Sequence, residues 1–248
     1  MPSGQVKEYE IEHFNNYGEN KDFDAFDERG YGRIINELLK NLSEPYTNLK
    51  AIDLGCATGC FTIRIADLGI KIKGIDISEN CIKYALKKNS NIQFEVGDIE
   101  NLNVSDEEFD VVVLFGVMHH FPELTDAINE SWRILKKGGI LFTYDPHMNN
   151  PFYWLYRHKK SPFRSTKGIT ENERPLTKGQ VKSALNKFKF IDSQIYCISG
   201  VTLSSKSAKY KGVIKRLIGL FNLIERLTDF YPLNNMLGAS IISVSKKG

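Results

Sequence analysis

The sequence lacks the long apolar segments that would place a protein in or across a membrane. No uninterrupted apolar run approaches the roughly 20 residues of a membrane-spanning helix. Residues 1–20 are mostly polar, so no secretory leader is expected there. With 42% hydrophobic and 25% charged residues, the chain has the composition of an ordinary globular protein, and we expect it in the cytoplasm.

Cysteine is also scarce, and its spacing excludes the common zinc-binding patterns. The four cysteines include Cys56 and Cys60, which lie four residues apart but have no further Cys or His partner nearby. We therefore expect no metal site, and we interpret the thiols as small, reduced core residues.

A strong overall charge is absent, but the charge is unevenly distributed. The net charge is +3, whereas residues 151–189 contain ten basic and only two acidic residues. Such a segment favours an anionic partner, such as a phosphate group or an acidic lipid surface, or else forms a solvated basic face. No separate nucleic-acid-binding module is recognisable, so we expect no DNA partner.

The most informative stretch present is AIDLGCATG at residues 51–59. An apolar run ends in Asp53, a turn of small residues contains Gly55, Ala57 and Gly59, and a helical pattern follows. Small residues allow a sharp bend and the close approach of a ligand, and the helix amino end offers unpaired N–H groups. The pattern predicts the strand–turn–helix unit that opens a nucleotide-binding sheet.

The spacing of the small residues distinguishes between cofactors. A dinucleotide fingerprint would place glycines at 55, 57 and 60, whereas this chain has Ala57 and Cys60. The Gly-x-Ala-x-Gly order, two positions after an acidic residue, resembles motif I of class I S-adenosylmethionine-dependent methyltransferases of the small-molecule type. That family usually has Gly at position 57. The resemblance implies S-adenosylmethionine as cofactor, S-adenosylhomocysteine as product, and cofactor contacts from Asp53, Gly55, Cys56, Ala57 and Gly59.

Later segments resemble further parts of the same family in the same order. IKGIDI at 72–77 ends at Asp76, 21 residues after Gly55, where a carboxylate can bind ribose hydroxyls. IQFEVGDI at 92–99 predicts a third strand whose end resembles the adenine site of that family, and FDVVVLFGVM at 109–118 predicts a fourth strand that is buried on both faces. The resemblance covers residues 49–147. It implies additional cofactor contacts from Asp76, Ile77, Asp98, Ile99, Phe115 and Gly116.

The alternation of apolar runs and helical patterns predicts the fold class. The repeats predict an α/β, doubly wound, parallel sheet. The resemblance implies the complete Rossmann-like sheet of seven strands, mostly parallel with an antiparallel last strand. Helices are expected at 31–42, 124–135 and 177–188, and later strands at 140–144, 189–198 and 239–247. We expect a single domain of residues 1–248. It would contain N-terminal lid helices (1–44), a cofactor-binding core (45–147), two acceptor-side insertions (148–176 and 202–238) and the last strand (239–248).

The segments expected on the acceptor side carry fewer recognisable motifs than the cofactor-binding core. Residues 6–31 hold aromatic side chains that either line the acceptor pocket or pack against the sheet: Tyr9, Phe14, Tyr17, Phe23, Phe26 and Tyr31. The insert at 203–236 contains a broad apolar helical face at 213–227. It could be a cap over the acceptor pocket, an interfacial helix in peripheral contact with a membrane, or a homodimer contact.

Candidate catalytic residues follow the fourth and fifth strands. If the acceptor is a hydroxyl, a general base helps to remove its proton, and His suits this task near neutral pH. His119 with Asp145 is the preferred pair and His120 the second choice, while His147 is also near. This arrangement resembles sugar O-methyltransferases that use a His–Asp pair as base. Alternatively, one His only packs against or hydrogen-bonds the loop.

These features together predict a methyltransferase acting on a small-molecule, lipid-linked or sugar-linked acceptor. We expect the methyl group to be transferred to an oxygen atom, and an anionic acceptor is one option. RNA or protein methylation is an alternative, although no Asn-Pro-Pro-Tyr type signature is present. A non-catalytic S-adenosylmethionine-binding module is another alternative. An NAD-dependent oxidoreductase is disfavoured by the glycine spacing.

Overall fold

The computed structural model describes most of the chain. The described residues are 7–20, 26, 28–158, 160–162, 170, 172–198, 223 and 233–248. The helix expected at 213–227, and with it most of the 203–236 insert, lies outside them. Among the helices that the structure describes, none combines the length and the apolarity required to cross a bilayer.

The described strands form one seven-stranded sheet in the order β3-β2-β1-β4-β5-β7-β6. Neighbouring strands are parallel except at β7, which runs antiparallel to both β5 and β6. This arrangement confirms the predicted mostly parallel sheet with an antiparallel last strand. The strand bounds are β1 Lys50–Leu54, β2 Lys71–Asp76, β3 Gln93–Val96, β4 Phe109–Phe115, β5 Leu135–Pro146, β6 Phe190–Ile198 and β7 Ser240–Lys247.

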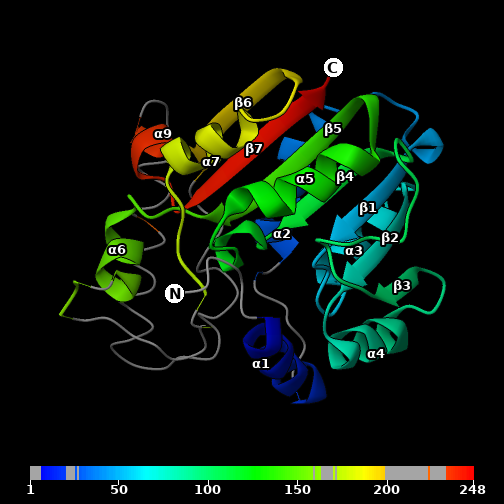
Figure 1. The fold of residues 1–248 in the computed structure, drawn as a ribbon, viewed down its shortest axis with the longest axis horizontal. Helices are drawn as coiled ribbons and strands as arrows, with labels where there is room; N and C mark the ends of the chain where they lie inside the picture. Colours follow the sequence, from blue (N-terminus) through cyan, green and yellow to red (C-terminus); the bar gives the residue numbers. More distant parts are fainter. Residues whose placement is uncertain are drawn as a thin grey trace.

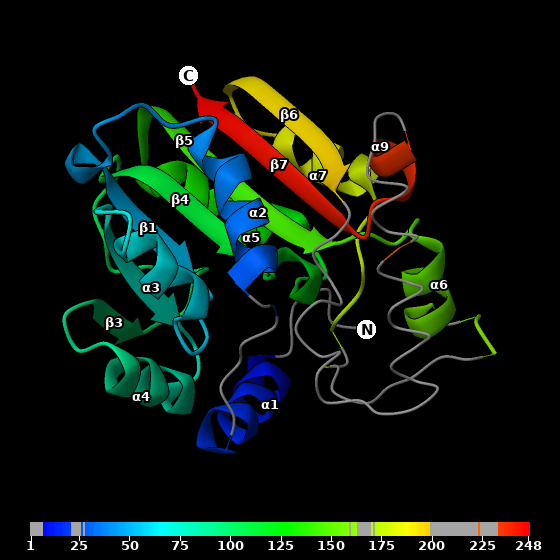
Figure 2. The same ribbon diagram turned by 180° about the vertical axis from the view of Figure 1, so that it is seen from behind.

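Helices cover both faces of the sheet (Figures 1 and 2). The α5 and α7 helices lie on one face, and α2 and α3 lie on the other. The helix bounds are α1 Lys7–Asn20, α2 Glu28–Leu39, α3 Cys60–Ala66, α4 Glu79–Lys88, α5 Leu124–Ile134, α6 Pro151–Arg157, α7 Lys178–Leu185 and α9 Leu233–Leu237, with 3₁₀ turns η1 at Tyr46–Asn48 and η2 at Met118–His120.

A hydrophobic core lies on each face because β1 and β4 alternate apolar side chains between the two. Ile52 and Leu114 pack with α5 and α7, whereas Ala51 and Val113 pack with α2 and α3. Fully burying an aliphatic side chain such as Ile34 of α2 contributes about 1.5–3 kcal/mol. The two cores therefore hold the central strands in place from both sides.

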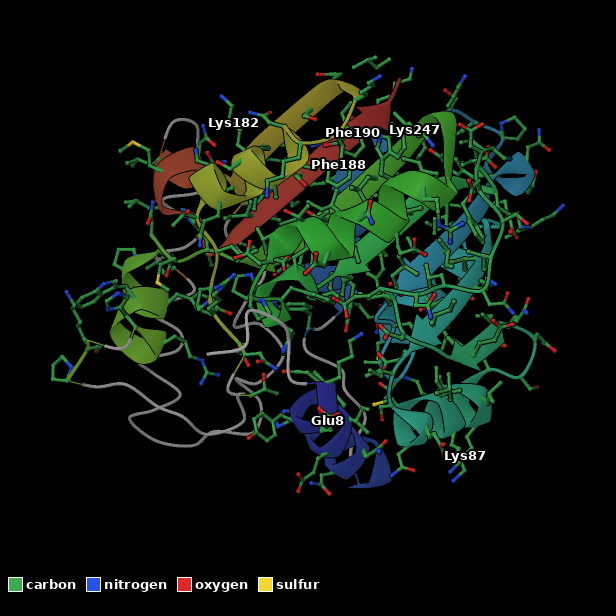
Figure 3. All side chains as sticks on the ribbon, viewed as in Figure 1. Glu8, Lys87, Lys182, Phe188, Phe190 and Lys247 are labelled. Carbon is green, nitrogen blue, oxygen red and sulfur yellow. The ribbon has the colours of Figure 1, made fainter. Side chains whose placement is uncertain are left out.

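Polar residues and aromatic contacts fix the helix ends. Ser78 caps α4 by accepting from the backbone N–H of Cys81 at 3.1 Å. Thr177 and Gln180 form a capping box at the start of α7. Phe188 follows α7 and Phe190 is the first residue of β6 (both labelled in Figure 3), and the Phe188 ring lies 6.3 Å from the ring of Trp132 in α5.

Several element boundaries differ from the sequence expectation. The helix expected at 31–42 spans Glu28–Leu39, and the strand expected at 92–99 ends at Val96. The fifth strand was expected at 140–144 but begins at Leu135, which pairs with Phe109 before a register shift. Gly138, with φ +77°, lies in that irregular stretch. The Lys-Gly segment at 136–139 therefore follows the end of α5 at Ile134 and lies within β5 as a bulge-like distortion.

Candidate active site

A cavity of about 340 Å³ lies at the carboxyl ends of the central parallel strands. Figures 1 and 2 place α1 beyond these strand ends, next to α4. Ten of the eleven predicted cofactor-binding residues line this cavity. They are Asp53, Gly55, Cys56, Ala57, Asp76, Ile77, Asp98, Ile99, Phe115 and Gly116.

The turn after β1 has the conformation that its small residues predict. Gly55 has φ +78°, and a Cβ there would lie 2.5 Å from the Cγ2 atom of Val117. Ala57 also has a positive φ of 46°, which for an L-residue costs roughly 1–2 kcal/mol. Its backbone N–H donates to Oδ2 of Asp76 at 2.8 Å, so the strained turn is tied to the end of β2.

Gly59 is the predicted cofactor residue that does not line the cavity. It is the N-cap of α3 with φ +73°, and a Cβ there would lie 2.7 Å from the Phe94 ring and 3.2 Å from the Ala85 Cβ. Gly at this position is therefore required by the left-handed backbone and by packing against β3 and α4.

Two buried carboxylates lie side by side under the turn. Asp76 accepts backbone N–H groups from Ala57 and Ser78, and burial raises its pKa despite these bonds. Asp53 accepts from Thr62 Oγ1 at 2.6 Å, but its Oδ1 has no hydrogen-bond partner among the described residues. Burial, reinforced by the charge of Asp76, raises the pKa of Asp53 to about 7. An unsatisfied acceptor in a cavity is suited to a bound ligand's ammonium or hydroxyl group.

The carboxylate expected at the adenine site has a partner from the N-terminal helix. Asp98 accepts the Glu100 backbone N–H at 3.0 Å through Oδ1, and its Oδ2 lies 2.5 Å from Lys7 Nζ. Lys7 also contacts the Glu100 carboxylate. The α1 helix is thus fastened directly to the end of the cavity that Asp98 lines, where the sequence predicts the adenine site.

At the other end of the cavity, the structure brings together the predicted catalytic pair. The Nδ1 atom of His119 lies 2.9 Å from Oδ1 of Asp145, which also accepts the His119 backbone N–H at 3.0 Å. His119 lines the cavity, whereas Asp145 is fully buried behind it. Burial lowers the pKa of His119 to about 4 and raises the pKa of Asp145 well above its usual range. The imidazole is therefore held neutral, in the state that can accept a proton.

His120 has its own carboxylate partner, which sequence reasoning did not find. Its Nδ1 lies 3.0 Å from Oε2 of Glu10, and Oε1 of Glu10 accepts from Asn172 Nδ2 at 2.8 Å. Burial raises the pKa of Glu10, but its interactions with His120, Thr170 and Asn172 outweigh this, so the pKa lies below the usual value. Glu10 could not be recognised from core motifs because it comes from a distant helix.

Other cavity residues also escaped the sequence prediction. His13, Tyr153, Arg157 and Glu173 line the acceptor end. Burial raises the pKa of Glu173, and the Arg157 charge opposes this shift. The only sequence signal for Tyr153, Arg157 and Glu173 was the basic character of residues 151–189, and no sequence signal pointed to His13.

His147, by contrast, does not reach the cavity. It is buried, with Nδ1 2.8 Å from the Gly238 carbonyl oxygen, to which it can donate. Of the predicted aromatics, Phe14, Phe26 and Tyr31 line the cavity and Tyr9 is exposed. The side chains of Tyr17 and Phe23 lie outside the described residues.

One group of side chains has metal-ligand character. His119, His120 and Glu173 each offer one ligand atom, and these atoms lie within 4.8 Å of one another. The positive charge of Arg157 lowers the pKa of both His119 and Glu173, so it acts on the same side chains. The carboxylate of Glu10 also faces His120, so charges of both signs act on this group.

The doubly wound sheet and its cavity define the class of the protein. S-adenosylmethionine carries ammonium, hydroxyl and amine groups that can donate hydrogen bonds. The cavity offers acceptors for them: the unsatisfied Asp53 oxygen, Asp76 at the end of β2 and Asp98 after β3. The turn at Gly55 lets a ligand approach the backbone closely. In agreement, the family model described as a methyltransferase domain matches residues 46–207. The chain belongs to this family of S-adenosylmethionine-dependent methyltransferases.

Curated relatives match the same core. A ubiquinone biosynthesis O-methyltransferase of Pelagibacter ubique is 32% identical over 42% of this chain and 45% of the relative. A malonyl-[acyl-carrier protein] O-methyltransferase of Buchnera aphidicola is 28% identical over 67% of this chain and 66% of the relative. The matches thus span about half to two thirds of these relatives, and they have small-molecule or carrier-linked acceptors in their names.

Solved structures share the fold along nearly the whole chain. A geranyl diphosphate C-methyltransferase of Streptomyces coelicolor, solved with Mg²⁺, geranyl diphosphate and S-adenosylhomocysteine, has a TM-score of 0.64 and 13% identity, covering 97% of this chain and 98% of its own. A methyltransferase of Thermotoga maritima, titled a possible histamine N-methyltransferase, has a TM-score of 0.61 and 20% identity, covering 88% and 89%. At these identities the similarity establishes the fold.

Proposed function

We propose that this protein transfers a methyl group from S-adenosylmethionine to an oxygen atom of a small-molecule acceptor, lipid-linked or sugar-linked acceptors included. The observation that carries the proposal is the buried His119–Asp145 pair at the acceptor end of the cofactor cavity. The two curated relatives described above are both named O-methyltransferases, which supports oxygen as the methylated atom. The four cysteines are free and buried, which supports a reducing, cytoplasmic location.

The cofactor would lie across the turn after β1. Asp53 and the Gly55 turn would hold its amino-acid part, Asp76 its ribose, and Asp98 with Ile99 its adenine. When bound, it supplies an electrophilic methyl group on a positively charged sulfur and leaves as S-adenosylhomocysteine. Much of the rate then depends on alignment of the acceptor oxygen opposite the breaking bond.

His119 would take the proton from the acceptor hydroxyl. With Nδ1 directed to Asp145, its Nε2 is the nitrogen left to act as base. The low pKa of about 4 keeps the ring neutral at physiological pH, and the contact of Nδ1 with Asp145 would hold the ring in one orientation toward the acceptor. The Arg157 guanidinium at the same end of the cavity favours an acceptor that carries a carboxylate or phosphate group.

The test is methyl transfer to a panel of phenols, catechols, sugars and hydroxy acids, followed by mass spectrometry. His119→Ala should reduce turnover about 100-fold or more, because it removes the general base. Its affinity for S-adenosylmethionine, measured by calorimetry, should stay near that of the unmodified protein.

His158→Ala is the matched control, because His158 does not line the cavity. It should keep full turnover. Unchanged turnover in His119→Ala would remove His119 from the mechanism. Product methylated only at nitrogen or carbon would refute transfer to oxygen.

A further inference from the structure

One buried carboxylate in the cavity belongs to no element of the cofactor-binding core. Glu10 lies in α1 and is only 3% exposed, although its neighbours Glu8 and Tyr9 are exposed. A buried carboxylate is costly unless it is paired. Glu10 pairs with His120 at 3.0 Å and accepts a hydrogen bond from Asn172 at 2.8 Å.

The buried position of Glu10 follows from helical spacing. Lys7, Glu10 and Phe14 are three and four residues apart, so they share one face of α1. Lys7 reaches Asp98 at 2.5 Å, and the Phe14 ring packs edge-on against His120 with ring centroids 5.4 Å apart. One face of a single helix therefore contacts both the adenine end and the acceptor end of the cavity.

Further contacts fix the helix at its carboxyl-terminal half. Asn15 Oδ1 accepts from Ser78 Oγ at 2.7 Å, and the Asn15 carbonyl oxygen accepts from Asn80 Nδ2 at 3.2 Å. The Phe14 carbonyl oxygen lies 3.4 Å from the Cys81 sulfur. These contacts join α1 to the start of α4, directly after the ribose-side Asp76. The placement of Glu10 is thus determined from both ends of the helix.

We propose that Glu10 is a positioning residue that orients His120 toward the acceptor. Glu10–His120 is a second histidine–carboxylate pair beside His119–Asp145, and the two imidazole centroids are 4.2 Å apart. Nδ1 of His120 lies 3.0 Å from Glu10 Oε2 and 3.4 Å from Thr170 Oγ1, so this side of the ring faces Glu10 and Thr170 and the rest of the ring is turned to the acceptor. The acceptor site is therefore complete only when α1 is docked. This inference rests on the proposed function in so far as the acceptor binds against the two histidines.

The kinetic test compares Glu10→Gln with Glu8→Gln in the full chain. Glu8, labelled on α1 in Figure 3, is the control because it is exposed on the same helix. Glu10→Gln should lower kcat about tenfold or more, while the Kd for S-adenosylmethionine changes less than about twofold. Glu8→Gln should leave both unchanged. In a His120→Gln background, Glu10→Gln should not lower kcat any further, because Glu10 acts through His120.

A spectroscopic test does not depend on turnover. In ¹⁵N-labelled protein, the imidazole nitrogen resonances of His120, assigned by their loss in His120→Gln, should shift in Glu10→Gln but not in Glu8→Gln. Unaltered His120 resonances, or a full additive loss of kcat in the double variant, would overturn the inference. If the resonances shift but no hydroxyl acceptor is methylated by the unmodified protein, the proposed function fails while the positioning of His120 by Glu10 stands.

Discussion

Asp53 and Asp76, at the ends of β1 and β2, are two buried carboxylates whose charge a cationic ligand could balance. Each is buried, and burial raises the pKa of each. Asp76 is held by two backbone N–H groups, while Asp53 keeps one oxygen without a partner among the described residues. A cationic ligand would compensate for the cost of ionising these groups in a buried environment.

Binding of S-adenosylmethionine should therefore be coupled to proton release from Asp53. The pKa of Asp53 is raised from 3.8 to about 7, so below pH 7 the unliganded protein keeps a proton that an ammonium ligand must displace. Affinity should be complete above the raised pKa and should fall by up to about tenfold for each pH unit below 7. Calorimetry between about pH 5.5 and 7, in buffers of different ionisation enthalpy, measures both the Kd and the protons released.

Asp53→Asn should remove this pH dependence, and Asp67→Asn is the control because Asp67 is exposed. A flat profile in the unmodified protein, or the same slope in Asp53→Asn, would show that another group is titrating.

At the scale of single elements, a short polar motif at the start of a helix stabilises it by binding the free backbone N–H groups of its first turn. The α7 helix begins with a capping box in which Thr177 accepts from the Gln180 backbone, and the Gln180 side chain accepts from the Thr177 backbone N–H. Its apolar side, with Val181 and Leu185, packs into the same core as α5. The cap therefore supports a helix that covers the sheet next to the acceptor end.

Thr177→Ala should lower the free energy of unfolding by about 1 kcal/mol, because it leaves the first-turn N–H groups without their side-chain acceptor. Urea-induced unfolding followed by circular dichroism measures the change. Ser183→Ala, an exposed hydroxyl removed from the interior of the same helix, should be nearly neutral. Equal losses in both variants would show that the cap contributes nothing particular.

The sequence was most predictive where chemistry is local. The Gly-x-Ala-x-Gly turn acts on backbone within a few residues, and the structure places it directly after β1, as expected. The helix expected from residue 177 likewise begins there, with Thr177 as its cap. The start of β5 was missed because Leu135 pairs with Phe109 of another strand, and the local apolar run at 140–144 gives no sign of that contact. Glu10 was missed because its place in the site depends on its contact with His120, which lies 110 positions away in the sequence. A helical plot of residues 7–14 would have found the shared face, but not its partner.

The charge pattern of the whole molecule bears on the choice of acceptor. Residues 151–189 carry ten basic and two acidic residues, and Arg157 from this segment lines the cavity. The opposite pole of the cavity carries the carboxylates of Asp53, Asp76 and Asp98. At the end with the two histidines, Arg157 supplies a positive charge beside the carboxylates of Glu10 and Glu173, so charges of both signs would face an acceptor there.

For an acceptor with a carboxylate or phosphate group, kcat/KM should fall several-fold as salt rises from about 0.02 to about 0.3 M, because screening weakens attraction to the basic segment. A neutral analogue with the same hydroxyl should show little change. Arg157→Gln should reduce the salt response of the anionic acceptor and raise its KM. Identical salt curves for charged and neutral acceptors would contradict an electrostatic role for this segment.

The position of β7 has a consequence for the order of events during synthesis. The ribosome makes β6 before β7, yet β7 lies between β5 and β6 and supplies the hydrogen bonds to both. Until residues 240–247 emerge, β6 has no place in the sheet and the edge of β5 remains open. The cofactor-binding strands β1 to β5 can pair early, whereas the far edge of the sheet must wait for a segment made about forty residues after β6 ends.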